Sequence, residues 1–205
     1  MKIPSLPQAK ELLAEAEQRN PGPWVAHSEY VGEAAQLIAR AHPTLDEESS
    51  LVLGLLHDIG RREGRTGKRH IVDGYSFLLK LGFDDSARVC LTHSFKVQKL
   101  DSMLGKGDLT ESESAFVKKF LSQIEFTDYD RLIQLCDSLA MHSGFCLLEK
   151  RMLDANLRLG VNEYTVPRWK AAFQTKRDLE EAIGNNIYSL LPGVVENTFG
   201  FSPDS

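Results

Sequence analysis

The most apolar stretch of this chain ends in two side chains that need water or a partner, His57 and Asp58. The stretch reads Leu51-Val-Leu-Gly-Leu-Leu-His-Asp-Ile-Gly60, and a helix that is apolar on nearly every side belongs in a protein core. An unpaired carboxylate is costly to bury there. A divalent metal ion resolves the conflict, because it binds imidazole nitrogen and carboxylate oxygen together. Since successive helical residues point about 100° apart, the remaining ligands must come from other segments.

The rest of the chain predicts helices almost throughout. Apolar periodicity, helix caps and Pro or Gly stops predict helices over about residues 6–19, 23–42, 46–58, 70–81, 84–93, 111–122, 129–141, 144–159 and 166–191. The expected irregular segments are a polar loop over 60–69, a flexible connection over 100–108 and a tail from residue 192. We find no repeat and no convincing strand alternation. One all-α domain over residues 1–205 is the economical interpretation, although the segment from about 142 onward could be a helical appendage.

Charge and cysteine content narrow the classes of partner and compartment. The chain has 205 residues and a formal net charge of −5, which does not suit coating long nucleic acid or an anionic membrane. No apolar run approaches the about 18 residues of a membrane span, and the N-terminus lacks the apolar region of a secretory signal. Cys90, Cys136 and Cys146 form no CxxC pair. We therefore expect buried thiols in a reducing compartment and a cytoplasmic protein.

Asp137 repeats the pattern of a polar side chain in an apolar helix. It lies on the apolar face of Leu132-Ile-Gln-Leu-Cys-Asp-Ser-Leu-Ala-Met141, and Asp is almost never fully buried unless it is paired. His27 lies on the inward face of the helix predicted over 23–42. These two residues, together with the His-Asp pair, place four metal-ligand side chains on three helices. Only a helical bundle brings residues so far apart in sequence to one site.

The order of these residues resembles the HD-domain superfamily of metal-dependent phosphohydrolases. Its signature is a His, then His-Asp at the end of a buried helix, then a distant Asp in an apolar helix. His27, His57-Asp58 and Asp137 fit those positions, and Leu-Leu-His-Asp-Ile-Gly looks like the central motif. The resemblance covers about residues 23–142. It implies an HD-domain helical bundle with its metal-binding core in that range and further helices at about 143–191.

Two more histidines make the pattern similar to the members of the superfamily that hold two metal ions. His70 opens the helix predicted over 70–81, and His93 ends the one over 84–93. The resemblance implies that Asp58 bridges two ions. His27, His57 and Asp137 would complete the site of the first ion, and His70 and His93 that of the second. The alternative is that His70 and His93 only mark helix ends, which leaves a single ion. We expect no role for His42 or His142.

The loop after the His-Asp pair concentrates positive charge in an acidic protein. Its basic residues are Arg61, Arg62, Arg65, Lys68 and Arg69. A guanidinium binds phosphate oxygens bidentately, so the loop could clamp a phosphate, and the alternative is a solvated loop without a ligand. Lys96, just after His93, could line the same site. We take Arg61, Arg62, Lys68, Arg69 and Lys96 as the candidate substrate-binding residues.

These residues together predict a metal-dependent phosphohydrolase. A divalent ion polarises a phosphoryl oxygen and lowers the pKa of water, and Asp58 is the candidate to orient that water as well as to bind metal. The expected substrate is a small phosphorylated, nucleotide-like molecule, and the expected cofactor is one or two ions of Fe, Mn, Co, Ni or Zn. Two alternatives stay open: a di-iron oxygenase of the inositol-oxygenase type and a nucleotide-sensing HD module. The sequence indicates no oligomeric state.

Overall fold

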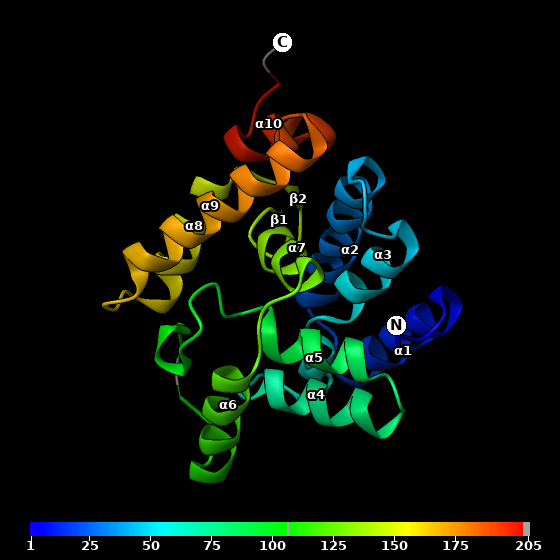
Figure 1. Cartoon of the computed structure of the whole chain (residues 1–205), viewed down its shortest axis with the longest axis vertical. Coiled ribbons are helices and arrows are strands. Elements are labelled where there is room, and N and C mark those ends of the chain that lie inside the picture. The colour runs from blue at the N-terminus through cyan, green and yellow to red at the C-terminus, as the bar shows by residue number, and fades with distance from the viewer. Residues whose placement is uncertain (106, 203–205) are drawn as a thin grey trace.

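The computed structural model describes residues 1–105 and 107–202, which fold into packed helices with one very short hairpin (Figure 1). The helices are α1 (Leu6–Arg19), α2 (Pro23–Ala41), α3 (Glu47–Leu56), α4 (His70–Lys80), α5 (Asp84–Thr92), α6 (Glu111–Gln123), α7 (Asp128–Cys136), α8 (Leu148–Leu159), α9 (Thr165–Ile183) and α10 (Val194–Phe199). Short 3-10 turns are η1 (Ile59–Glu63), η2 (Leu100–Ser102) and η3 (Ile187–Leu190), and the hairpin strands are β1 (Ala140–Met141) and β2 (Gly144–Phe145). The predicted all-α class is confirmed.

The segment after α7 departs from the sequence prediction. The helix expected over 129–141 ends at Cys136, and β1 and β2 form an antiparallel pair with Ala140 opposite Phe145. Gly144, the first residue of β2 after the turn, has a φ of +135°, which ordinary side chains rarely adopt. A tight turn therefore replaces the end of one predicted helix and the start of the next, and α8 begins only at Leu148.

The C-terminal region also differs from the prediction. The helix expected to reach residue 191 ends at Ile183, because Gly184 takes a left-handed conformation with a φ of +65°, a common way for a helix to stop. The tail expected to be irregular from residue 192 contains α10, which lies between Gly193 and Gly200, both with positive φ. The sequence-based prediction did not anticipate that single glycines end the helices of this region.

The helix starts follow from local capping chemistry. Ser5 and Gln8 form a reciprocal capping box at α1, and Thr127 and Asp130 do the same at α7. In each box the hydroxyl accepts a backbone N–H while the downstream side chain accepts the N–H of the cap residue, so two otherwise unpaired donors are satisfied. Asp46 caps α3 through the N–H of Ser49.

Helix α7 lies at the centre of the fold, with α2 and α3 on one side and α8 and α9 on the other (Figure 1). The largest buried apolar cluster draws on α2, α7 and α9, a second fills the space between α1, α3 and α5, and a third joins α4, α5 and α6. Within residues 1–105 and 107–202, no helix combines the length and apolar character that a membrane crossing needs.

Two glycine contacts bring the polar segments of this core close together. A Cβ added at Gly54 of α3 would lie 2.5 Å from Gly32 Cα in α2, and one added at Gly60 would lie 2.0 Å from the carbonyl oxygen of His70. Real side chains do not fit at such distances, so both contacts require backbone against backbone. The first sets α2 against the helix that ends at His57. The second sets the turn after Asp58 against the start of α4.

Candidate metal centre

Six ligand-type side chains meet where several helices end. His57, His93 and Asp137 are the residues that follow the last turn of α3, α5 and α7, and His70 is the first residue of α4. His27 comes from the middle of α2. The four histidines and Asp58 are buried, and the Asp137 side chain is 22% exposed. The structure therefore brings together all six residues that the sequence predicted as ligands.

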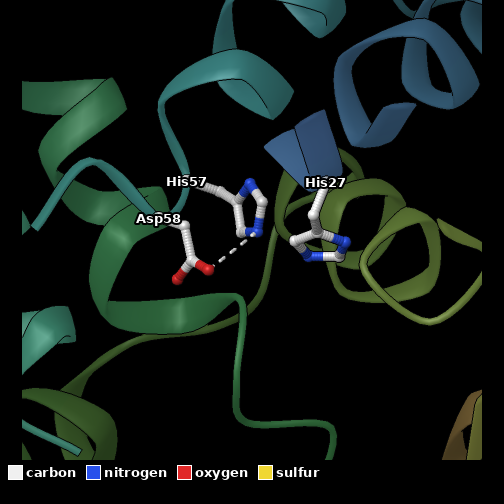
Figure 2. Close-up of side chains that lie close together, drawn as sticks. All are labelled: His27, His57 and Asp58. Carbon is white, nitrogen blue, oxygen red and sulfur yellow. Dashed lines mark ion pairs between the residues drawn. The ribbon is translucent and has the colours of Figure 1, made fainter. Parts of the chain in front are cut away.

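His27, His57 and Asp58 form one group that could hold a metal ion (Figure 2). One ligand atom from each lies within 4.8 Å of the other two. The rings of His27 and His57 meet edge to face with centroids 5.3 Å apart, and His57 Nε2 lies 3.8 Å from Asp58 Oδ2, the dashed line in Figure 2. Asp137 adjoins this group, because its Oδ1 lies 3.2 Å from His27 Nε2.

Asp58, His70 and His93 form a second such group. Asp58 Oδ1 lies 3.3 Å from His70 Nε2 and 3.5 Å from His93 Nε2. Asp58 thus belongs to both groups and presents a different oxygen to each. This is the arrangement expected of a carboxylate that serves two neighbouring cation positions.

Backbone carbonyls fix which nitrogen of three imidazoles faces the centre. His57 Nδ1 donates to the carbonyl of Gly54 at 2.7 Å, His70 Nδ1 to that of Gly67 at 2.6 Å, and His93 Nδ1 to that of Cys90 at 3.0 Å. A carbonyl only accepts, so each Nδ1 must carry hydrogen. In the neutral ring the lone pair is then on Nε2, which points into the cluster. Metal-binding histidines are usually oriented by such a bond from the other ring nitrogen.

Several buried atoms at the centre have no hydrogen-bond partner in the described part of the chain. They include His57 Nε2, His70 Nε2 and Asp58 Oδ1. A neutral His70 and an ionised Asp58 would turn two electron pairs toward each other across 3.3 Å, which is unfavourable without a positive charge between them. A divalent ion satisfies these atoms together, so the residues present fit a metal.

Burial keeps the imidazoles in the form that binds metal. It lowers the pKa of His70 to about 4 and that of His93 to about 3, and it lowers the pKa of His57 as well. Burial works against ionisation of Asp58, but the guanidinium of Arg61 and the surrounding imidazoles outweigh it and hold the pKa of that carboxyl well below its usual range. Near neutral pH His57, His70 and His93 are therefore neutral, and Asp58 is ionised.

Asp137 also lies beside two cationic side chains. Lys96 Nζ lies 3.6 Å from Asp137 Oδ2, and Arg151 of α8 lies 3.9 Å from Oδ1. Burial raises the pKa of this carboxyl, but the hydrogen bond from His27 and the two cations offset that effect and hold the pKa well below its usual range. Asp137 is therefore an anion that faces an imidazole and two cations at once.

Only some of the basic residues predicted to bind phosphate lie at the centre. Arg61 binds Asp58 with Nε 2.5 Å from Oδ2, and Lys96 lies beside Asp137. Arg62 is instead buried on Glu15 of α1 and over the ring of Phe77, so its charge is engaged within the fold.

The other two predicted clamp residues also lack an ionic link to the centre. Arg69 pairs with Asp73, and Lys68 is half-buried. Among residues 1–105 and 107–202, no hydrogen bond or ion pair joins Arg62, Lys68 or Arg69 to the six ligand-type residues. Of the five predicted substrate-binding residues, the structure therefore brings Arg61 and Lys96 to the centre.

Two residues at the centre were missed by the sequence reading. Arg151 gave no signal, because an arginine in a helix is usually a surface residue. Asp108 accepts the backbone N–H groups of Gly67 and Arg69 at 2.5 and 2.9 Å. It thereby holds the backbone on both sides of the Gly67 carbonyl, which orients His70. An acidic residue in a glycine-containing connection is too common a pattern to predict this contact.

Comparison with known proteins agrees with this geometry. The HD domain family matches residues 24–142, a range that contains all six ligand-type residues and nearly coincides with the resemblance predicted over 23–142. Searches of curated proteins and of solved structures give no match. The match spans more than half of the chain and a cluster of buried His and Asp side chains that can hold a divalent metal. The chain therefore belongs to the HD domain family, a family of metal-dependent hydrolases.

Proposed function

We propose that this protein hydrolyses a phosphomonoester or phosphoanhydride bond in a small, nucleotide-like molecule, with water activated by metal. The single observation that carries the proposal is a buried ligand cluster edged by three cations. Arg61 lies against Asp58, while Lys96 and Arg151 lie against Asp137. A metal cluster alone suits many reactions, but this setting favours an anionic substrate.

Charge balance gives the reason. Two carboxylates face three cations, which leaves one positive charge, and one divalent ion would raise it to three. In a partly buried site such an excess attracts anions strongly, because charges are screened less than in water. A phosphate dianion reduces the excess and accepts the planar donors of a guanidinium.

The ligand-type side chains form two groups, each of which could hold one metal ion. His27, His57, Asp58 and Asp137 would hold one ion, and Asp58, His70 and His93 would hold a second. A divalent ion when bound supplies Lewis acidity, polarising a phosphoryl oxygen and lowering the pKa of water. The chemistry of His and carboxylate ligands admits Fe, Mn, Co, Ni or Zn.

Asp58 orients rather than deprotonates in this proposal. Its pKa is held well below the usual range, so it is a poor proton acceptor near neutral pH. Its Oδ2 accepts from Arg61, and its Oδ1 faces His70 and His93. An ionised oxygen in a fixed position can accept a hydrogen bond from water and align it with the phosphorus.

A thiol nucleophile does not suit this chain. Burial raises the pKa of Cys146 to about 11, and it raises the pKa of Cys90 and Cys136 further. All three are free and buried. We take them as structural residues and assign the protein to a reducing compartment, the cytoplasm.

The test is phosphate release by protein purified without chelator and analysed for metal. The panel contains nucleoside mono-, di- and triphosphates, dinucleoside polyphosphates and simple phosphomonoesters. We expect the wild type to release phosphate, H57A to lose both metal and activity with its helicity retained, and H142A, which changes an exposed histidine, to behave as the wild type.

The same experiment separates the alternatives. Metal-loaded protein that releases no phosphate but consumes O₂ with a polyol or phosphonate is an oxygenase. Protein that binds a nucleotide without turnover is a sensing module. A fully active, metal-replete H57A variant refutes the ligand assignment.

A further inference from the structure

Arg151 approaches the metal centre from outside the part of the chain that matches the HD domain. It belongs to α8, whose first residue, Leu148, lies beyond the matched range of 24–142. Its Nε donates to the backbone carbonyl of Asp137 at 3.4 Å, and its guanidinium lies 3.9 Å from the carboxylate of the same residue. Helix α8 therefore places a cation on a residue that the family pattern places among the ligands.

The contacts of Arg151 leave most of its hydrogen-bonding capacity unused. Its bond to Asp154 is 3.4 Å long, whereas charge-assisted hydrogen bonds are usually about 2.7–2.9 Å. Arg158, about two helical turns further along α8, binds the same Asp154 at 2.8 and 3.0 Å. Asp154 is thus well satisfied by Arg158, and a guanidinium has five N–H donors in a planar fork. Arg151 is available for a second ligand.

Lys96 is the other half of this arrangement. Its side chain is only 13% exposed, and its contact with Asp137 at 3.6 Å is longer than a normal hydrogen bond. Burial lowers the pKa of Lys96, which Asp137 opposes and the neighbouring Arg151 and Arg168 reinforce. Lys96 and Arg151 are therefore held near each other by contacts with the same carboxylate, Asp137.

We propose that Lys96 and Arg151 form a phosphate-binding subsite on the Asp137 side of the metal centre. The inference rests on the proposed function, since it assigns residues to the substrate of that reaction. Lys96 supplies a compact charge, and Arg151 supplies the bidentate donors that match two phosphate oxygens. When Asp137 shares its charge with a metal, Lys96 and Arg151 lose part of the anion that they share. A phosphoryl group then replaces it.

The subsite assigns a task to the C-terminal helices. The HD-matched range can hold the ions, while α8 contributes a substrate contact that the matched range lacks. Affinity for phosphate should therefore depend on a residue that metal binding does not require.

The test is calorimetric titration of inorganic phosphate into metal-loaded protein. For R151A we expect the Kd for phosphate to rise about tenfold or more, which corresponds to losing a charged hydrogen bond, with the metal content unchanged. The matched control is R177A, which removes an exposed arginine of α9 that donates to Gln174; within the described residues no hydrogen bond or ion pair joins it to Asp137 or Asp154. Its Kd should stay within about twofold of the wild type.

Two further variants guard against a purely structural effect. R151Q keeps length and a polar end without the charge and should bind phosphate as weakly as R151A, whereas R151K should recover part of the affinity. Equal Kd values for R151A and wild type, or loss of metal in R151A, would overturn the subsite. Absence of any phosphate binding by the wild type would overturn it too.

The inference and the proposed function fail in different ways. Arg151-dependent phosphate binding without hydrolysis of any panel substrate keeps the subsite and removes the hydrolase. Hydrolysis with a KM unaffected by R151A keeps the hydrolase and removes the subsite.

Discussion

Substituting Gly60 with alanine should separate the two segments that form the second ligand group. Gly60 lies in η1, two residues after Asp58, and packs directly on the first turn of α4. The new Cβ would lie 2.0 Å from the carbonyl oxygen of His70 and 2.4 Å from the backbone nitrogen of Gly74. Both neighbours are backbone atoms in a helix, so neither can rotate aside as a side chain could.

The required displacement is large on the scale of metal coordination. Real Cβ atoms essentially never approach within 3.0 Å, so η1 and α4 must move apart by about 1 Å at His70, the difference between 3.0 and 2.0 Å. Metal–ligand distances tolerate about 0.2 Å. Overpacking of this kind costs roughly 1–3 kcal/mol, and each kcal/mol lowers the Tm of a chain this long by about 2–4 °C.

Elemental analysis and thermal unfolding of G60A test this reasoning together. We expect the Tm to fall and the second group, which contains Asp58 and His70, to lose its ion. The matched control is G107A, because a Cβ at Gly107 meets nothing within 4 Å. Wild-type Tm and metal content in G60A would show that the close contact does not fix the geometry of the centre.

Four further outcomes follow from the same contacts. H70A should reduce bound metal from two ions to one by elemental analysis, and one ion in both proteins would leave only a mononuclear centre. D108A should weaken binding of the same ion while leaving the other in place, because it frees the backbone on both sides of the carbonyl that orients His70. R88A should destabilise the protein by about 3 kcal/mol in urea unfolding, since it leaves the fully buried Asp130 without its ion pair. The metal-free protein should lose stability between pH 7 and pH 5 in the same urea assay. Histidines of the unfolded chain have a pKa near 6.5, whereas the pKa values of His70 and His93 in the folded protein are about 4 and 3. The unfolded state therefore binds more protons than the folded state as the pH falls, and the free energy of unfolding decreases.

The sequence predicted the ligand cluster better than its surroundings, and the reason is physical. His57 and Asp137 stand out because polar side chains seldom interrupt apolar helices, so the expected burial already implies a partner. Arg62 and Arg151 carry no such signal. Arginine is common on protein surfaces. Arg62 pairs with Glu15 because of how α1 packs, and Arg151 lies near Asp137 because of how α8 packs. No local sequence pattern encodes either packing.

The helix boundaries show the same limit. Apolar periodicity identified α2 and α5 with nearly correct bounds, because their buried faces repeat over whole turns. The β1–β2 hairpin was missed, since its strands have two residues each and leave too little sequence for an alternating pattern. The sequence therefore predicted which face of a helix is buried. It did not predict the path of the chain after the helix ends.

The positions of the ligand-type residues at helix ends suit a cation in the interior of this centre, and the neighbouring cations suit an anion beside it. Helices α3, α5 and α7 are followed directly by His57, His93 and Asp137, and the C-terminus of a helix carries partial negative charge. The Nδ1–H groups of His57 and His93 each donate to a carbonyl of the last turn, where the N–H donors of the helix itself run out. The same bond therefore ends the helix and aims Nε2 inward. Three negative helix ends and two carboxylates would stabilise positive charge between them, and the cations that contact those carboxylates would favour a phosphate beside them.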